Sequence, residues 1–160
     1  MLAEFKALTP DEQRQLFDAI PLITILVAGA DGNMDEDEKH AAEKIAKIRG
    51  FTNSSKLMPY YEEVGKNFMT HLEELFATMP RDVETRQPRL IERLALLNPI
   101  LAKLSPWVAY YFYKDFISFA HHVAEASGGF MRYLTVGPQE AKVIDLHMIH
   151  PIAEPEEKES

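Results

Sequence analysis

The stretch Leu22–Ala30 is apolar all round when it is drawn as a helix, and this constrains the fold more than any other feature of the chain. Such a helix is stable in water only where other elements surround it, so the stretch predicts a central helix in a bundle. The longest nearly uninterrupted apolar run, Ala19–Ala30, has 12 residues and includes Pro21 and Thr24. Because about 20 residues are needed to cross a bilayer, we expect no transmembrane segment.

Signals for the starts and ends of helices occur along the whole chain, whereas alternating strand-like runs are nearly absent. Thr9 with Glu12, and Asp35 with Glu38, each form the capping-box pattern that begins a helix. We predict helices from residue 10 with a restart or kink at Pro21, over 35–49, over 57–79 as one long helix, over 81–104 as two pieces, over 106–126 and over 137–149. The fold class is therefore all-α, a single-domain bundle of about seven to eight helices.

Composition excludes several classes of protein. The chain has 160 residues, 46% of them hydrophobic, which suits one globular domain. A net charge of −8 argues against nucleic acid as a partner, because phosphate backbones require a positive surface. The absence of cysteine excludes a disulfide framework and a Cys-type zinc site. The first residues lack the pattern of a signal peptide, so we expect a cytoplasmic location.

The negative charge is concentrated in two segments of the chain. Residues 31–40 carry −4 and residues 150–160 carry −3, which together make up −7 of the net −8. The second segment combines charges with prolines and has little apolar surface to bury. We therefore expect residues 1–149 to form the domain and residues 150–160 to form a disordered acidic tail.

The first acidic segment offers the oxygen ligands that Ca²⁺ and Mg²⁺ require. These side chains lie within eight residues: Asp31, Asn33, Asp35, Asp37 and Glu38. An EF-hand is excluded, because a loop counted from Asp31 has Glu36 at the position of the glycine and Ala42 at the position of the bidentate glutamate. An alternative needs no ion, since Asp35 and Glu38 could serve only to cap the helix that they begin.

A short internal repeat relates the two halves of the chain. Residues 27–32 (VAGADG) resemble residues 123–128 (VAEASG), and each copy is followed by a helix that begins with an acid, Glu38 in the first and Glu140 in the second. The repeat predicts a pseudo-two-fold arrangement of two units, each made of a helix, a glycine turn and a second helix. If Glu38 and Glu140 lie close together, they can share one ion.

The string ILVAGADGNMDEDEKHAAEKIAKI, with the later VAEASGG and the helix start at Glu140, resembles the TerB-like family of bacterial tellurite-resistance proteins. The resemblance implies an all-helical single domain with acidic loops that bind divalent cations, and a role in tellurite, metal or envelope stress response or signalling. By position, Asp31, Asp35 and Glu38 match the first acidic motif, and Glu140 matches the second. Ser127 stands where a second Asp is expected, and the loop after it is longer and less acidic than the family pattern.

Histidines provide a second metal hypothesis. His121, His122 and Glu125 lie within about one helical turn, and His147 and His150 are three residues apart, which is compatible with zinc. The adjacent His121 and His122 point about 100° apart, so at most one faces any given partner. No glutamate has a histidine three residues later, which disfavours a di-iron centre. We therefore favour Ca²⁺ or Mg²⁺ over Zn²⁺.

The predicted helix over 106–126 contains seven of the 16 aromatic residues of the chain, all between Trp107 and Phe119. They occupy so many phases of one helix that some must lie at a surface, where a protein partner or a second copy of the chain can bind. A helical interaction module of this kind, without a metal site, is the alternative function. The sequence also leaves peripheral association with a membrane open.

No catalytic motif identifies a reaction, because neither a glycine-rich phosphate loop nor a Gly-x-Ser-x-Gly elbow is present. We therefore predict a non-enzymatic protein, with a His/carboxylate metalloenzyme as the third hypothesis after the interaction module. The predicted metal ligands are Asp31, Asn33, Asp35, Glu38 and Glu140.

Overall fold

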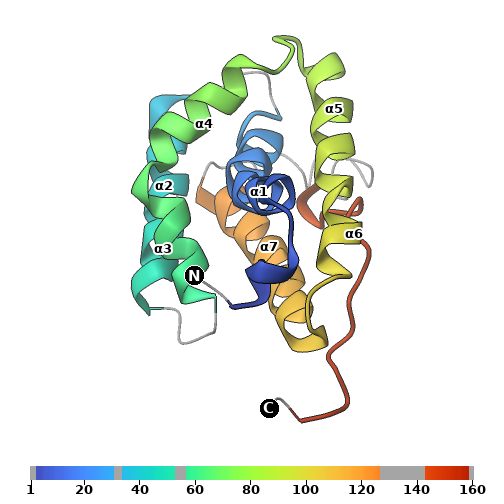
Figure 1. Cartoon of the computed structure of the whole chain (residues 1–160). Coiled ribbons are helices and arrows are strands. Elements are labelled where there is room, and N and C mark those ends of the chain that lie inside the picture. Colours follow the sequence, from blue (N-terminus) through green and yellow to red (C-terminus); the bar gives the residue numbers. More distant parts are fainter. Residues whose placement is uncertain (1–2, 31–33, 53–56, 127–142, 159–160) are drawn as a thin grey trace.

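The computed structural model describes residues 3–30, 34–52, 57–126 and 143–158. Helices account for most of these residues, and no strand occurs among them (Figure 1). The all-α prediction is confirmed, and the helices pack around one core as a single domain. Within the same ranges, no helix combines the length and the apolarity needed to cross a membrane.

Within these described ranges, the elements are a short 3-10 helix and seven α-helices. In chain order they are η1 (Ala3–Ala7), α1 (Pro10–Ala28), α2 (Glu36–Thr52), α3 (Met58–Lys66), α4 (Phe68–Ala77), α5 (Val83–Ala95), α6 (Leu97–Leu101) and α7 (Pro106–Ala126).

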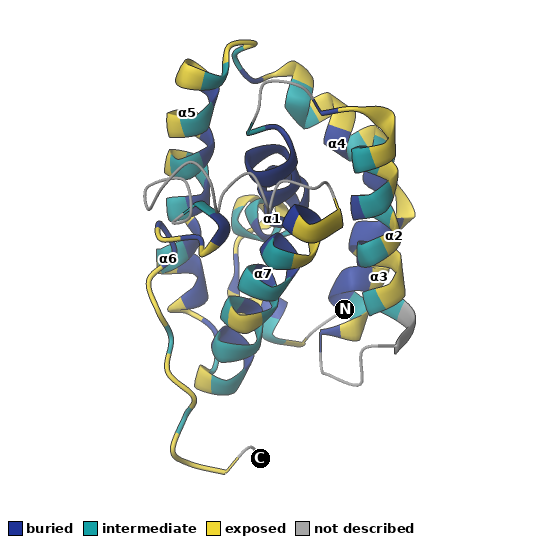
Figure 2. Ribbon diagram, turned by 180° about the vertical axis from the view of Figure 1, so that it is seen from behind, coloured by how far each residue is buried: buried dark blue, intermediate teal, exposed yellow. Residues whose placement is uncertain are grey.

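Helix α1 forms the centre of the bundle. Every residue from Asp18 to Ala28 is buried, as the apolarity of this stretch predicts. Helix α7 packs along α1. Helix α1 also contacts α2, α4 and α5. Figure 2 shows that the surrounding helices turn their buried faces inward and their exposed faces outward. The core is therefore arranged around one helix.

Pro21 lies inside α1, which continues through it, so the helix does not restart at this position. A proline has no N–H, and one hydrogen bond of the helical ladder is therefore missing. Two buried hydroxyls donate to carbonyls in the same stretch of α1. The Thr24 hydroxyl donates to the Ile20 carbonyl at 2.9 Å, and the Tyr60 hydroxyl donates to the Leu16 carbonyl at 2.5 Å.

Two glycines allow α2 and α3 to approach each other closely. A Cβ atom on Gly50 would lie 3.3 Å from the Cα atom of Glu62, and one on Gly65 would lie 3.2 Å from Cγ of Lys47. Gly50 therefore lies inside a continuous α2, where its lack of a side chain allows α3 to pack closely. The prediction that this helix ends at residue 49 is wrong, because α2 extends to Thr52.

The segment predicted as one helix over 57–79 is divided into α3 and α4. Asn67 separates the two, and its φ of −131° and ψ of 37° lie outside the helical region. The segment 81–104 does contain the two predicted pieces, α5 and α6. The boundary between the two pieces falls at Leu96, and the prolines of this segment, Pro88 and Pro99, lie inside α5 and α6.

The second copy of the predicted repeat falls largely within residues 127–142, which lie outside the described residues, so the pseudo-two-fold arrangement stays a prediction. After them, Ile144, Leu146 and Ile149 are buried in the core. From residue 150 the tail runs along α6 toward the start of α7 without forming a helix (Figure 1). Ile152 packs against the core at the beginning of this tail.

We predict that Tyr60→Phe lowers the free energy of unfolding by about 1–2 kcal/mol. Burial raises the pKa of Tyr60 well above its ordinary value, so the neutral phenol donates to the Leu16 carbonyl, and this donor is lost while the ring packing is kept. Tyr113→Phe, at a half-buried position on α7, is the control and should leave stability unchanged. Urea unfolding measures both variants, and equal stabilities of Tyr60→Phe and wild type would contradict this role.

Candidate functional site

The start of α2 holds two of the five predicted metal ligands. Glu38 donates its backbone N–H to Oδ1 of Asp35 at 2.8 Å, and Asp35 donates its N–H to Oε1 of Glu38 at 3.3 Å. The two residues form the predicted capping box, and the acidic first turn lies at the positive end of the helix dipole. The other three ligands, Asp31, Asn33 and Glu140, lie outside the described residues.

The capping box uses one oxygen of each carboxylate. Oδ2 of Asp35 accepts no hydrogen bond from a residue that the structure describes, and Asp35 is exposed. Among the described residues, no group of three or more histidine, aspartate or glutamate side chains could hold a metal ion. The described part of the loop therefore presents acidic side chains but no complete metal site.

Helix α1, which leads into the acidic loop, has its C-terminal end beside Arg86, a buried arginine of α5. Nη2 of Arg86 donates to the Gly29 carbonyl at 2.9 Å, and Nη1 donates to the Arg81 carbonyl at 2.9 Å. The guanidinium also lies 5.1 Å from the ring centroid of Phe76. A positive charge at this end of α1 stabilises the negative end of its dipole. Sequence analysis missed Arg86, because its partner Gly29 is 57 residues away.

A buried carboxylate lies in the first half of α1. The side chain of Asp18 is only 3% exposed. It accepts hydrogen bonds from Nε2 of His71 at 2.6 Å, from Arg93 at 3.3 Å and from Arg14 at 3.4 Å. Pairing of this kind offsets the cost of removing a carboxylate from water. The ring nitrogen that faces Asp18 carries a proton, which fixes the orientation of the imidazole.

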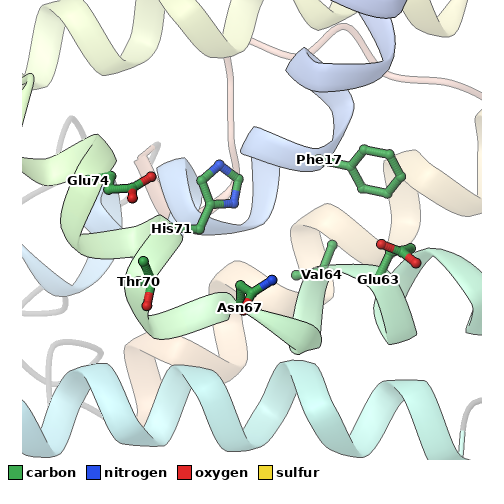
Figure 3. Close-up of a pocket in the computed structure, with 7 residues that line it drawn as sticks. All are labelled: Phe17, Glu63, Val64, Asn67, Thr70, His71 and Glu74. Carbon is green, nitrogen blue, oxygen red and sulfur yellow. The ribbon is translucent and has the colours of Figure 1, made fainter.

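His71 also lines a cavity of about 400 Å³ at the junction of α1, α3 and α4. The lining residues are Phe17, Glu63, Val64, Asn67, Thr70, His71 and Glu74 (Figure 3). The buried Asp18 thus holds an imidazole at the wall of a polar cavity, as in enzymes that use histidine as an acid or base. The described lining residues include one hydroxyl group, on Thr70, but no serine or cysteine. The cavity can hold a polar ligand, but it does not define a reaction.

Sequence analysis did not find the Asp18 cluster. Asp18 and His71 are separated by 53 residues, and Asp18 and Arg93 by 75. The only local signal is that Asp18 immediately precedes the long apolar run, where the pattern places a buried residue. That signal indicates that the carboxylate needs partners, but it does not say which helices supply them.

The predicted histidine pairs are held by separate partners. Nε2 of His121 lies 2.9 Å from Oδ1 of Asp145, whereas Nδ1 of His122 accepts a hydrogen bond from Arg49 at 3.0 Å. The two adjacent rings therefore face different partners, as the helical geometry predicts. No described residues complete a three-ligand group with either ring, so this part of the chain gives no support to the zinc hypothesis.

The aromatic residues of α7 divide between the core and the surface. The buried ones are Phe112, Phe116 and Phe119. Trp107, Tyr110 and Tyr111 are half-buried, and we call these three residues the aromatic face. Their ring centroids lie 5.7 Å (Trp107–Tyr111), 6.0 Å (Trp107–Tyr110) and 6.1 Å (Tyr110–Tyr111) apart. Tyr111 also packs against the core, so the cluster has a fixed base.

Comparison with known proteins gives no match: no family model, curated protein or solved structure matches this chain. The TerB-like resemblance therefore rests on its sequence motifs alone.

We predict that Asp18→Asn destabilises the protein by about 1–3 kcal/mol, because hydrogen bonds to charged groups contribute about this much and the charge is removed from a buried network. Asp11→Asn is the matched control, since Asp11 is exposed and also pairs with Arg14. It should change stability little, as expected of surface ion pairs. Chemical denaturation of both variants tests this, and a similar effect at the two positions would contradict a structural role for Asp18.

Proposed function

We propose that this chain is a non-enzymatic, TerB-like helical protein of the cytoplasm that binds Ca²⁺ or Mg²⁺ in a tellurite, metal or envelope stress response. The ligands are the acidic-loop residues Asp31, Asn33, Asp35 and Glu38, joined by Glu140. The observation that carries the proposal is the capping box, because it fixes Asp35 through Oδ1 while Oδ2 accepts no bond from a described residue. A carboxylate held in this way loses little conformational freedom when it binds a cation.

The local charge also favours a cation. Residues 31–40 carry a charge of −4, and the carboxylates of the first turn of α2 repel one another. A divalent cation reduces this repulsion, and Ca²⁺ and Mg²⁺ prefer oxygen ligands over the nitrogen and sulfur ligands that suit zinc. Capping alone uses only Asp35 and Glu38. The proposed cation site therefore gives the other acidic residues of the loop a role as well.

We predict that Asp35→Asn weakens binding of Ca²⁺ or Mg²⁺ about tenfold or more, because affinity depends on the number of charged ligands. It should leave the stability without the ion unchanged, because Asn caps a helix as well as Asp does. Isothermal titration calorimetry measures the binding, and thermal unfolding without and with the ion measures the stability.

Asp82→Asn is the matched control for this experiment. Asp82 is the N-cap of α5, where its carboxylate accepts the N–H of Thr85 at 2.9 Å, and it lies outside the acidic loop. Cation binding should be the same in Asp82→Asn as in wild type. If Asp35→Asn also binds the ion like wild type, the loop only caps α2. Zn²⁺ binding that survives Asp35→Asn would instead support a site made by the histidines.

A second candidate function is interaction with a protein partner or a second copy of the chain through α7. The observation that favours it is the aromatic face, where Trp107 and Tyr110 pack on Tyr111 at the surface rather than in the core. Clustered aromatic side chains that combine a large apolar area with a polar tip are typical of protein interfaces. Lys114 adds a positive charge, with its Nζ atom 5.3 Å from the ring centroid of Tyr110.

A further inference from the structure

The C-terminal tail reaches the aromatic face. Nε1 of Trp107 donates to the backbone carbonyl of Glu157 at 2.9 Å. Figures 1 and 2 show the tail passing α6 and ending near the start of α7. Of residues 150–158, only Ile152 and Pro155 are half-buried, and the others are exposed. The tail therefore contacts the domain through a few positions and through its backbone.

The spacing of these positions indicates how the tail is held. Ile152 and Pro155 are three residues apart, and three residues make one turn of a polyproline II helix, so an extended segment presents both on one face. Pro151 and Pro155 both favour such an extended backbone. Residues 151–155 form neither helix nor bend, and a bend follows at Glu156 and Glu157, where Trp107 donates its N–H to the Glu157 carbonyl. An aromatic ring that donates its N–H to a backbone carbonyl of a proline-containing segment is similar to the way aromatic-lined surfaces bind proline-rich peptides.

We propose that the aromatic face is a docking surface for an extended, acidic, proline-containing segment of a partner protein, and that the chain's own tail occupies this surface in cis. The inference rests on the interaction function proposed for the aromatic face and is independent of the cation site. Charge supports the choice of partner, because the seated tail carries Glu154, Glu156 and Glu157, while Lys114 lies beside Tyr110.

The tail acts as a competitor that a partner must displace. A segment tethered to its own site has an effective concentration of about millimolar order. Its contacts within the described residues are few: the hydrogen bond from Trp107, a second one from the His150 backbone N–H to Oδ1 of Asn98 at 2.8 Å, and two half-buried residues. A partner segment that fills the same positions with more apolar area can therefore displace the tail, whereas weakly matching peptides are excluded.

The test uses the full chain and the fact that Trp107 is its only tryptophan. The indole N–H signal of Trp107 in a ¹H–¹⁵N NMR spectrum reports the contact directly. The probe is a synthetic peptide with the sequence of residues 150–158. Pro155→Ser in the protein weakens the tail without touching any helix. We expect the peptide to move the indole signal in Pro155→Ser at a concentration about tenfold lower than in wild type, because the competitor in cis is weakened.

Two further variants test whether the peptide binds at the aromatic face. In the Pro155→Ser background, Tyr110→Ser should weaken peptide binding about tenfold, as for an aromatic residue central to an interface. Met58→Ser is the matched control, because Met58 is an exposed apolar residue of α3 that is not part of the aromatic face, and should leave binding unchanged. A peptide carrying serine in place of Pro155 should bind more weakly than the native sequence.

Three results would overturn the inference, and they have different meanings for the aromatic face. If the peptide moves the indole signal of neither protein, the peptide does not occupy the aromatic face. If the signal of Pro155→Ser instead depends on protein concentration, a second copy binds there, and the interaction function survives. If only anionic vesicles of phosphatidylserine and phosphatidylcholine change the Trp107 emission, the face binds membranes, and both proposals fail.

Discussion

The burial of α1 from Asp18 to Ala28 is the constraint on which the rest of the structure depends. A helix surrounded on all sides removes its polar groups from water as well as its apolar side chains, and those groups need partners inside the protein. Two places on α1 show this need, the Asp18 carboxylate and the Gly29 carbonyl at its C-terminal end. Neighbouring helices supply hydrogen-bond donors to both groups: His71 and Arg93 donate to Asp18, and Arg86 donates to the Gly29 carbonyl. The polar contacts thus fix which helices lie beside the two halves of α1.

Helix α5 has a central part in this arrangement. Arg86 and Arg93 are seven residues apart, which places them on the same face of the helix, about 10 Å apart along its axis. That face is turned toward α1, where one arginine reaches the carbonyl end and the other reaches Asp18. Arg49 has the same role on the other side of the bundle, joining α2 to Tyr61 of α3 and to α7. Because Arg86 holds the last turn of α1, it also fixes the point from which the acidic loop departs.

The sequence predicted what local chemistry determines. Both capping boxes involve residues three apart, so the starts of α1 and α2 follow from the sequence alone. Tertiary packing explains one misprediction, because Gly50 lies inside α2 at the point where α3 approaches closely. The segment 57–79 divides at Asn67 although its apolar pattern continues, so this break has no local signal. The Asp18 cluster could not be predicted, because its partners come from distant parts of the chain. Of the candidate metal site, the structure describes only the capping residues, and their geometry agrees with the local pattern.

The two acidic segments of the chain relate differently to the proposed functions. In the cation site proposed for the loop, the carboxylates themselves serve as the ligands, so the affinity of that site depends on charge and on the placement of side-chain oxygens. In the tail, Trp107 contacts a backbone carbonyl, and the three glutamates Glu154, Glu156 and Glu157 are exposed. Their charge therefore contributes to attraction over a distance, which salt screens, whereas the contact itself is made by a backbone carbonyl. Net charge alone does not distinguish these two cases. The distinction comes from which atoms of each segment the folded domain contacts.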